Sequence, residues 1–373
     1  MGDEENSPFE RAGDGIRPPL GRDAVKTGVL ECWSNGVMGR FRIAVGLLLV
    51  ASLGLWIGAF PTEAQDVRAK AEAEGKLMFY ATFNAADSKT LVDGFKQLYP
   101  KIDATYYRAT DSVMVEKIVT ESRAGQHLWD IVMTSSFYGH NLKKRGLFAP
   151  YDSPERKFYR DGYKDPQATW TSAYTNYAAL GYNTRAVPAT SVPKSYSDLL
   201  KPEWKGQIGM ESRPYEWFGT MVKAMGDEKG LAYMRELAKQ AQLRAGRTLL
   251  AQLVAAGEFK GALTAYSQTF EVLKPSGAPV DWVYLNPVFA NIHPTGIAIK
   301  APHPNAARLF VDFVLSKRGQ ELIRGMNRIP DRIDMPPEQS RLIEGVKPAF
   351  ASPEVLENVE RYAKIFHEIF GGR

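Results

Sequence analysis

The chain has 373 residues, a length that favours two folded parts over a single one. Hydrophobic residues make up 44% and charged residues 24% of the chain, and its net charge is +5, so the composition excludes a disordered, fibrous or multiply membrane-spanning protein. Lys and Arg are scattered along the chain rather than clustered, which gives no reason to expect a nucleic-acid partner.

An apolar run near the N-terminus predicts export. Ile43 to Phe60 carries no charge and follows Arg40 and Arg42, which is the pattern of a secretory signal. We expect residues 38–64 to form a signal peptide that is cleaved after Ala64, which makes the remainder of the chain periplasmic. An uncleaved membrane anchor is the alternative, because the run is just long enough to span a bilayer.

The segment before this signal has no apolar periodicity. We expect residues 1–37 to be unstructured or to result from an upstream translation start, because Met38 would begin a signal peptide of ordinary form. The single cysteine, Cys32, falls in this segment, so a disulfide framework and a cysteine zinc site are excluded.

After the signal, short apolar runs alternate with amphipathic patterns. The predicted strands of this part are 77–81, 104–107 and 130–133. A helix capped by Asp87 is predicted before the second strand, another that begins at Asp111 or Ser112 before the third, and one that ends near Lys144 after it. Strands that alternate with helices predict an α/β fold with a mainly parallel, doubly wound sheet.

A second unit of the same kind follows a long strand predicted at 174–183. Its predicted strands are 207–210 and 262–265, and its predicted helices are 215–225, 228–239 and 248–255. A second long strand, 296–299, precedes a helix with Pro304 in its first turn. An apolar stripe from Val355 to Phe366 predicts a C-terminal helix, which we expect to dock on the first unit.

Motifs of catalysis are absent from the sequence. It has no GxSxG elbow, phosphate-binding P-loop, HExxH pair or EF-hand loop, and its five histidines show no metal-ligand spacing. We therefore expect no enzyme, no cofactor and no bound metal. An exported hydrolase that uses Ser135 or Ser136 is kept as an alternative, although no general base is identified for it.

Polar side chains follow three of the predicted strands at the point where each strand ends. These candidate ligand-binding residues are Thr82 and Asn84, Ser135 and Ser136, and Glu211 and Arg213. Ligands of open α/β sheets bind outside the carboxyl ends of the strands, and the helix N-termini there suit an anion. The alternative for each short polar residue is that it only caps a helix.

Two tyrosines complete the candidate set. Tyr266 follows the strand predicted at 262–265, and Tyr174 begins the first long strand. Each phenol could reach a ligand, or each ring could be an aromatic residue at the edge of the core. Arg213 is the candidate charge partner for an anion, and the alternative is a solvated arginine.

Several segments together resemble one known family. KLMFYATFN, LWDIVMTSS, KPEWKGQIGMES, AAGEFKGALTAYS and HPTGIAIKAPHPNAARLFVDFVLSKRGQELI resemble, in this order, the periplasmic solute-binding proteins of ABC importers. The closest branch is the ferric-iron, phosphonate and sugar-phosphate type. The resemblance covers about residues 65–373.

The resemblance implies a type II-like fold in which two doubly wound lobes are joined by two crossing hinge strands and close around a ligand. Lobe 1 would comprise residues 66–173 and 300–373, and lobe 2 residues 174–299, with hinge strands at about 174–183 and 291–299. A monomer would deliver a small-molecule solute to permease and ATPase subunits at the inner membrane. A role in feeding a membrane sensor stays open.

The ligand is a separate question. Ferric-binding relatives typically use two adjacent tyrosines in the second lobe, whereas Ala265-Tyr266-Ser267 holds one. The hydroxyl-rich junctions, Arg213 and the net charge of +7 after residue 64 fit a phosphonate, a phosphorylated compound or a carboxylate better. Ferric iron, with Tyr266 as a ligand, is the alternative.

Overall fold

A computed structural model describes residues 63–371. The segment 1–37 and nearly all of the expected signal peptide, 38–64, lie outside these residues. Within the described part we find no helix with both the length and the apolar character that crossing a bilayer requires.

Three parallel strands form the centre of the first lobe, in the order β2-β1-β3. The strands are β1 (Lys76–Ala81), β2 (Asp103–Arg108) and β3 (Ile131–Met133), and the helices around them are α1 (Glu63–Glu74), α2 (Ala85–Leu98), α3 (Asp111–Arg123), α4 (Ser136–Lys144), α9 (Pro304–Leu315) and α10 (Lys317–Gly325). Phe79, Phe95 and Phe310 are fully buried between strands and helices, and their ring contacts fix α2 and α9 on the sheet.

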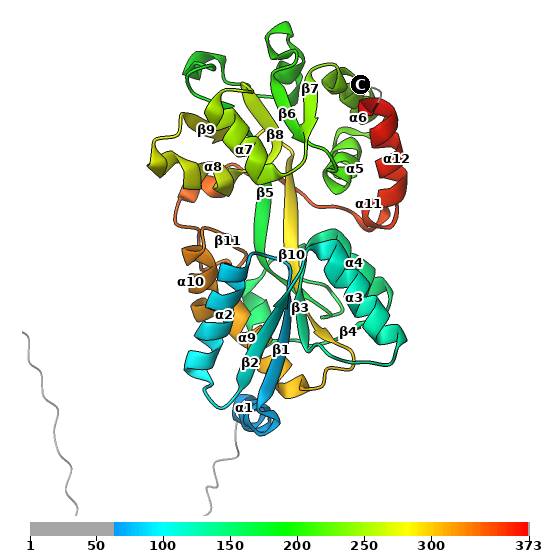
Figure 1. Cartoon of the computed structure of the whole chain (residues 1–373), viewed down its shortest axis with the longest axis vertical. Coiled ribbons are helices and arrows are strands. Elements are labelled where there is room, and N and C mark those ends of the chain that lie inside the picture. The colour runs from blue at the N-terminus through cyan, green and yellow to red at the C-terminus, as the bar shows by residue number, and fades with distance from the viewer. Residues whose placement is uncertain (1–62, 372–373) are drawn as a thin grey trace, which may run out of the picture. The chain divides into compact units, whose positions relative to one another are not determined.

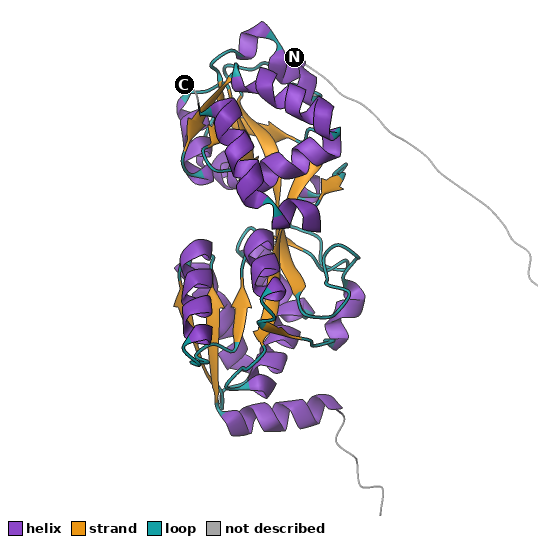
Figure 2. Ribbon diagram, turned by 90° about the vertical axis from the view of Figure 1, so that its right-hand side faces the viewer, coloured by secondary structure: helices purple, strands orange, loops and turns teal. Residues whose placement is uncertain are grey.

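The second lobe repeats this construction around the parallel order β8-β6-β7. Its elements are β6 (Ile208–Glu211), α5 (Tyr215–Met225), α6 (Asp227–Ala238), β7 (Ala241–Arg244), α7 (Arg247–Ala256), β8 (Gly261–Tyr266), α8 (Ser267–Leu273) and β9 (Val280–Val283). Figure 2 shows helices covering the strands in both lobes. Parallel strands covered in this way are buried, as the apolar run of β8 requires.

Two long antiparallel strands, β5 (Thr171–Asn183) and β10 (Val288–Ala298), belong to both lobes. β10 pairs with β3 of the first lobe, and β5 pairs with β8 of the second (Figure 1). Gly181 of β5 has no side chain because the ring of Phe270 occupies the place where a Cβ would stand. The expected hinge strands overlap β5 and β10, which are longer than predicted.

The remaining elements are short. Two-residue strands β4 (Phe148–Ala149), β11 (Ile329–Pro330) and β12 (Pro348–Ala349) pair with β5 or β10. Single 3-10 turns occupy connections at Pro154–Phe158, Ala189–Ser191, Tyr196–Leu200, Pro202–Trp204, Lys274–Ser276 and Ser340–Leu342.

The C-terminal stretch departs from the prediction in two ways. It forms two helices, α11 (Pro353–Glu357) and α12 (Val359–Phe370), with a break at Asn358. The expected docking on the first lobe holds for α11, which contacts α4, and is wrong for α12, which packs against α5 and α6 of the second lobe. Its rings Tyr362, Phe366 and Phe370 surround Phe218 of α5, which offers an aromatic partner for the stripe.

The cap of α2 also differs from the prediction. The N-cap residue is Asn84, whose Oδ1 accepts a hydrogen bond of 2.8 Å from the N–H of Asp87. Asp87 therefore lies inside the first turn, where its carboxylate faces the positive end of the helix dipole.

Candidate functional site

A cavity of about 380 Å³ lies between the lobes, at the carboxyl ends of β3, β6 and β8. We call it the cleft. Its charged lining residues are Asp111, Arg213, Glu216 and Arg247, and its uncharged polar ones include Ser135, Asn176, Tyr266, Asn291 and His293. Both lobes and both long strands therefore contribute to it, which is where an open α/β sheet binds its ligand.

Arg247 is held rigidly in the cleft wall. Its Nε donates a hydrogen bond of 3.1 Å to the carbonyl of Thr264, and its guanidinium lies 5.0 Å from the ring centroid of Tyr266. Thr264 has a φ of 78°, which a β-branched residue adopts only where the surroundings demand it. That backbone conformation is part of how the end of β8 presents Arg247 and Tyr266 on one wall.

Arg213 is the second cation of the cleft. It lies exposed in the loop between β6 and α5. Neither Arg213 nor Arg247 forms an ion pair with any residue in the range 63–371. Two guanidinium groups without a carboxylate partner are suited to a phosphate, phosphonate or carboxylate group.

Four side chains form a hydrogen-bonded chain across the cleft. Ser136 of the first lobe contacts Glu216 of the second, and its Oγ lies 3.2 Å from Oδ1 of Asn291 on β10. The Nδ2 of Asn291 donates a hydrogen bond of 2.9 Å to the phenol oxygen of Tyr266. The first lobe, the long strand and the second lobe are thus linked side chain by side chain.

The two acidic groups of the cleft differ in their surroundings. Asp111 accepts hydrogen bonds from the hydroxyl of Thr134, at 2.5 Å, and from the N–H of Ser135, at 3.0 Å. Burial raises the pKa of Glu216 to about 7, although its contact with Ser136 and the charge of Arg247 oppose that shift. Glu216 can therefore carry a proton near neutral pH.

Of the residues predicted from the sequence, Ser135, Arg213 and Tyr266 line the cleft. Ser136 lines a neighbouring cavity, and its hydroxyl contacts Glu216 and Asn291, which line the cleft. These four come from three different junctions, so the structure brings together part of the set that the sequence predicted.

Thr82 and Asn84 are used inside the first lobe. The hydroxyl of Thr82 donates a hydrogen bond of 3.2 Å to the carbonyl of Met133. Asn84 caps α2 and is exposed, without lining the cleft. Asn84 therefore caps a helix, which was the alternative to ligand binding, and Thr82 links the end of β1 to the end of β3.

Tyr174 and Glu211 are also held away from the cleft lining. The buried ring of Tyr174 stacks on His293, with centroids 4.0 Å and planes 14° apart. The carboxylate of Glu211 accepts hydrogen bonds from the N–H groups of Ser212, at 3.0 Å, and Gly246, at 2.8 Å. Glu211 thereby fixes the loop that leads into Arg247.

Sequence reasoning missed most of the cleft's polar groups. Asn176 and Asn291 lie in the two long strands, and a single polar residue within a strand gives no sequence signal of a ligand site. Arg247 follows Gly246 at the start of α7, and this glycine, with a φ of 103°, was the available signal of a special turn. Glu216 lies in the first turn of α5, where an acidic residue is ordinary.

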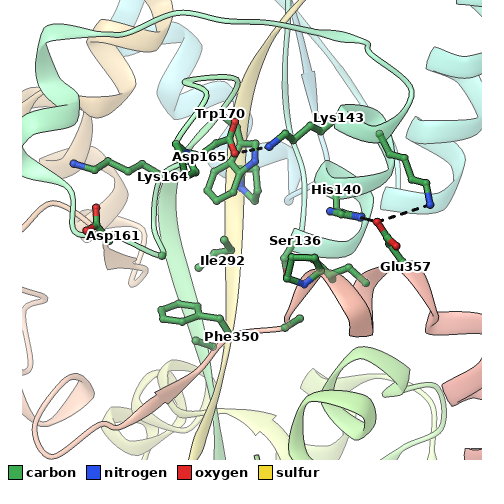
Figure 3. Close-up of a pocket in the computed structure, with 18 of the residues that line it drawn as sticks. Ser136, His140, Lys143, Asp161, Lys164, Asp165, Trp170, Ile292, Phe350 and Glu357 are labelled. Carbon is green, nitrogen blue, oxygen red and sulfur yellow. Dashed lines mark hydrogen bonds and ion pairs between the residues drawn. The ribbon is translucent and has the colours of Figure 1, made fainter. Parts of the chain in front are cut away.

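A larger cavity of about 960 Å³ lies on the other face of β10 (Figure 3). Ala290, Ile292 and Pro294 line it, whereas Asn291 and His293 line the cleft, as alternation along a strand requires. We call it the rear cavity.

Most charges of the rear cavity are paired within the protein, and the exceptions are Lys164, which donates to the carbonyl of Arg156 at 3.2 Å, and Asp161, which forms no ion pair with another described residue. The Nζ of Lys143 donates to Asp165 at 2.5 Å, and Glu357 lies 4.0 Å from Lys144 and 3.9 Å from His140. Its remaining lining is largely apolar, with Trp170 and Phe350 in view in Figure 3. The cleft, with two unpaired arginines, is the better site for a charged solute.

The side chains that the cleft offers to a metal ion are mainly tyrosines. Within residues 63–371, no three His, Cys, Asp or Glu side chains are grouped as metal ligands. Three tyrosines, Tyr138, Tyr215 and Tyr266, line the cleft. The phenol of Tyr215 pairs with the Nε2 of His367 at 2.9 Å, and burial raises the pKa of Tyr138, which disfavours the phenolate that a ferric ion needs.

The chain is similar in sequence to known solute-binding proteins. A family model described as bacterial extracellular solute-binding protein matches residues 126–358. The Fe(3+)-binding periplasmic protein of Serratia marcescens is 24% identical over 269 residues, which cover 69% of this chain and 78% of that protein.

Solved structures are similar over almost their whole length. Iron-bound HitA from Pseudomonas aeruginosa has a TM-score of 0.69 at 20% identity and covers 79% of this chain and 99% of its own. AfuA from Actinobacillus pleuropneumoniae, a periplasmic binding protein with fructose-6-phosphate bound, has a TM-score of 0.66 at 20% identity and covers 80% and 99%. The predicted two-lobe α/β fold is thereby confirmed.

Proposed function

Because the chain belongs to the bacterial extracellular solute-binding protein family, whose members serve ABC importers, we propose that it captures a small organic anion in the cleft. Arg213 and Arg247 carry this proposal, since both line the cleft without an ion pair to another described residue. Tyr266 and Ser135 supply hydrogen bonds beside them. A phosphonate, a phosphorylated compound or a carboxylate is the proposed class of solute.

Delivery to a permease follows from a difference in shape between loaded and empty protein. Our proposal is that β5 and β10 act as the hinge and that an anion bridging the lobes favours their closed arrangement. The export signal at 38–64 belongs to the same proposal, because the solute must be met outside the inner membrane.

Ferric iron is the second candidate. It is supported by the iron named for the Serratia relative and for HitA, and by the three cleft tyrosines. A hydrolase that uses Ser135 or Ser136 is not proposed further, because the matched proteins are binding proteins and Ser136 contacts Glu216 and Asn291.

A thermal-shift screen tests the function. Phosphonates, sugar phosphates, carboxylates and ferric citrate are added to the purified protein, and a true solute raises the melting temperature with its concentration. Arg213→Ala should weaken binding of an anionic solute by about 1–3 kcal/mol, if its guanidinium makes a charge-assisted contact. No shift across all four classes would contradict the proposal.

A further inference from the structure

The hydrogen-bonded chain across the cleft can point in two directions. Ser136 has one hydroxyl proton, yet its Oγ contacts the carboxyl of Glu216 and also Oδ1 of Asn291. One proton can make a full hydrogen bond to only one of these two acceptors. The orientation of the whole chain therefore depends on whether Glu216 supplies a proton of its own.

With a proton on Glu216, every bond in the chain is satisfied in one direction. Glu216 donates to Ser136, Ser136 donates to Asn291, and the amide of Asn291 donates to Tyr266 at 2.9 Å. The phenol of Tyr266 only accepts in this arrangement. Its own proton is left to donate to an anion in the cleft.

Without that proton, the chain is satisfied only in the reverse direction. Ser136 then donates to the carboxylate of Glu216, and the side-chain amide of Asn291 must turn over to donate to Ser136. The amide oxygen now faces Tyr266, which gives its proton to it. Tyr266 presents a lone pair to the cleft, and a lone pair repels an anion.

Burial is the effect that favours a proton on Glu216. Burial raises its pKa to about 7 and the charge of Asp111 adds to this, while the hydrogen bond from Ser136, the charge of Arg247 and the N–H of Phe137 oppose the shift. Seven other titratable or charged residues line the cleft around Glu216. They are Asp111 of α3, Tyr138 of α4, Arg247 of α7, Tyr266 of β8 and His293 of β10, together with Arg213 and Tyr215, which lie close to Glu216 in the sequence. An anion that binds among these groups repels the negative charge of the Glu216 carboxylate and so also favours its protonated form.

We propose that capture of an anionic solute is coupled to the uptake of one proton by Glu216, which sets the direction of the chain through Ser136 and Asn291 to Tyr266. This inference rests on the proposed function, since it needs an anion in the cleft. It assigns Glu216 a positioning role, because Glu216 acts on the solute through Tyr266.

Calorimetry in buffers of different ionisation enthalpy measures the protons taken up, with methylphosphonate and fructose 6-phosphate as probes. At pH 8 we expect close to one proton per probe for the wild type, and affinity that falls up to about tenfold per pH unit above pH 7. In the Glu216→Gln variant the glutamine amide still donates a hydrogen bond to Ser136. We therefore expect this variant to bind the probes without taking up that proton, and its affinity to depend less on pH. The comparison between the two proteins removes the probe's own titration.

Two further variants sharpen the result. Glu228→Gln removes an exposed carboxylate of the same lobe and should behave as the wild type. Tyr266→Phe should weaken binding at pH 6 more than at pH 8, because its proton is available only when Glu216 is protonated. If neither probe binds, the proposed function fails and the inference with it. If a probe binds and Glu216→Gln takes up as many protons as the wild type, the inference alone is overturned.

Discussion

The guanidinium of Arg247 lies over the ring of Tyr266, 5.0 Å from its centroid, so a cation and a phenol from different elements form one surface of the cleft. Arg247 begins α7 and Tyr266 ends β8, and the carbonyl of Thr264 connects them through its hydrogen bond to Arg247. A guanidinium held by a ring and a carbonyl loses little freedom when an anion arrives. Such preorganisation increases affinity without adding contacts.

Arg247→Ala should therefore weaken an anionic solute by about 2 kcal/mol, close to thirtyfold in Kd, since a charge-assisted hydrogen bond is lost. Arg247→Lys should recover only part of this, because a lysine cannot form two parallel hydrogen bonds. Titration calorimetry measures both. Arg235→Ala, an exposed arginine on α6, is the control and should leave the Kd unchanged.

The iron alternative gives a different expectation for Tyr266. Its phenol accepts a hydrogen bond from Asn291, burial raises the pKa of Tyr138, and the phenol of Tyr215 pairs with the Nε2 of His367. We expect ferric citrate to produce no visible tyrosinate band in the purified protein. A band that appears with iron and is bleached by Tyr266→Phe would show that iron is the cargo and would reverse our preference.

The alternation of strands and helices was predictable from the pattern of apolar residues. A strand that is buried on both faces reads as a continuous apolar run, and a helix that is buried on one side reads as apolar residues at helical spacing. That reasoning located β1, β3, α5 and the start of α9 to within a residue or two. It could not place the C-terminal helix, because a stripe such as Tyr362 and Phe366 shows which face is buried and not which surface covers it.

The candidate site was predictable only where a polar residue stands at the end of a predicted strand. Arg213 and Tyr266 follow strands, where a ligand is expected, and both line the cleft. Asn176 and Asn291 become neighbours of that cleft through the pairing of β5 with β10, a contact between segments more than a hundred residues apart. Periodicity within a short window carries no information about such pairing.

A buried carboxyl outside the cleft predicts the pH dependence of stability. Asp331 accepts a hydrogen bond of 2.6 Å from the hydroxyl of Thr175, its Oδ2 has no partner, and burial raises its pKa to about 7. The folded state keeps this proton while the unfolded chain loses it near pH 4. The free energy of unfolding therefore falls as the pH rises from about 4 to 7, and the full cost remains above pH 7.

Asp331→Asn removes this cost. We expect the variant to be more stable than the wild type at pH 8, by about 1–3 kcal/mol, and to differ little at pH 4.5. Urea unfolding at both pH values measures the difference. Asp161→Asn, an exposed carboxylate, should show no such dependence. Equal gains at the two pH values would assign the effect to packing and not to the proton.

The packing of α12 on the second lobe predicts a large effect at its centre. Phe366 is fully buried, lies 5.6 Å from the ring of Phe218 and stacks on Phe370 at 4.5 Å. Phe366→Ala leaves a cavity among these rings, so we expect the free energy of unfolding to fall by about 3–5 kcal/mol. Glu368→Ala changes an exposed residue of the same helix and should lower the free energy of unfolding by less than about 0.5 kcal/mol.

Because α12 covers α5, which carries Glu216, hydrogen exchange in α5 should accelerate in Phe366→Ala while exchange in α2 of the first lobe stays unchanged. Faster exchange in α2 alone would mean that the helix stabilises the other lobe.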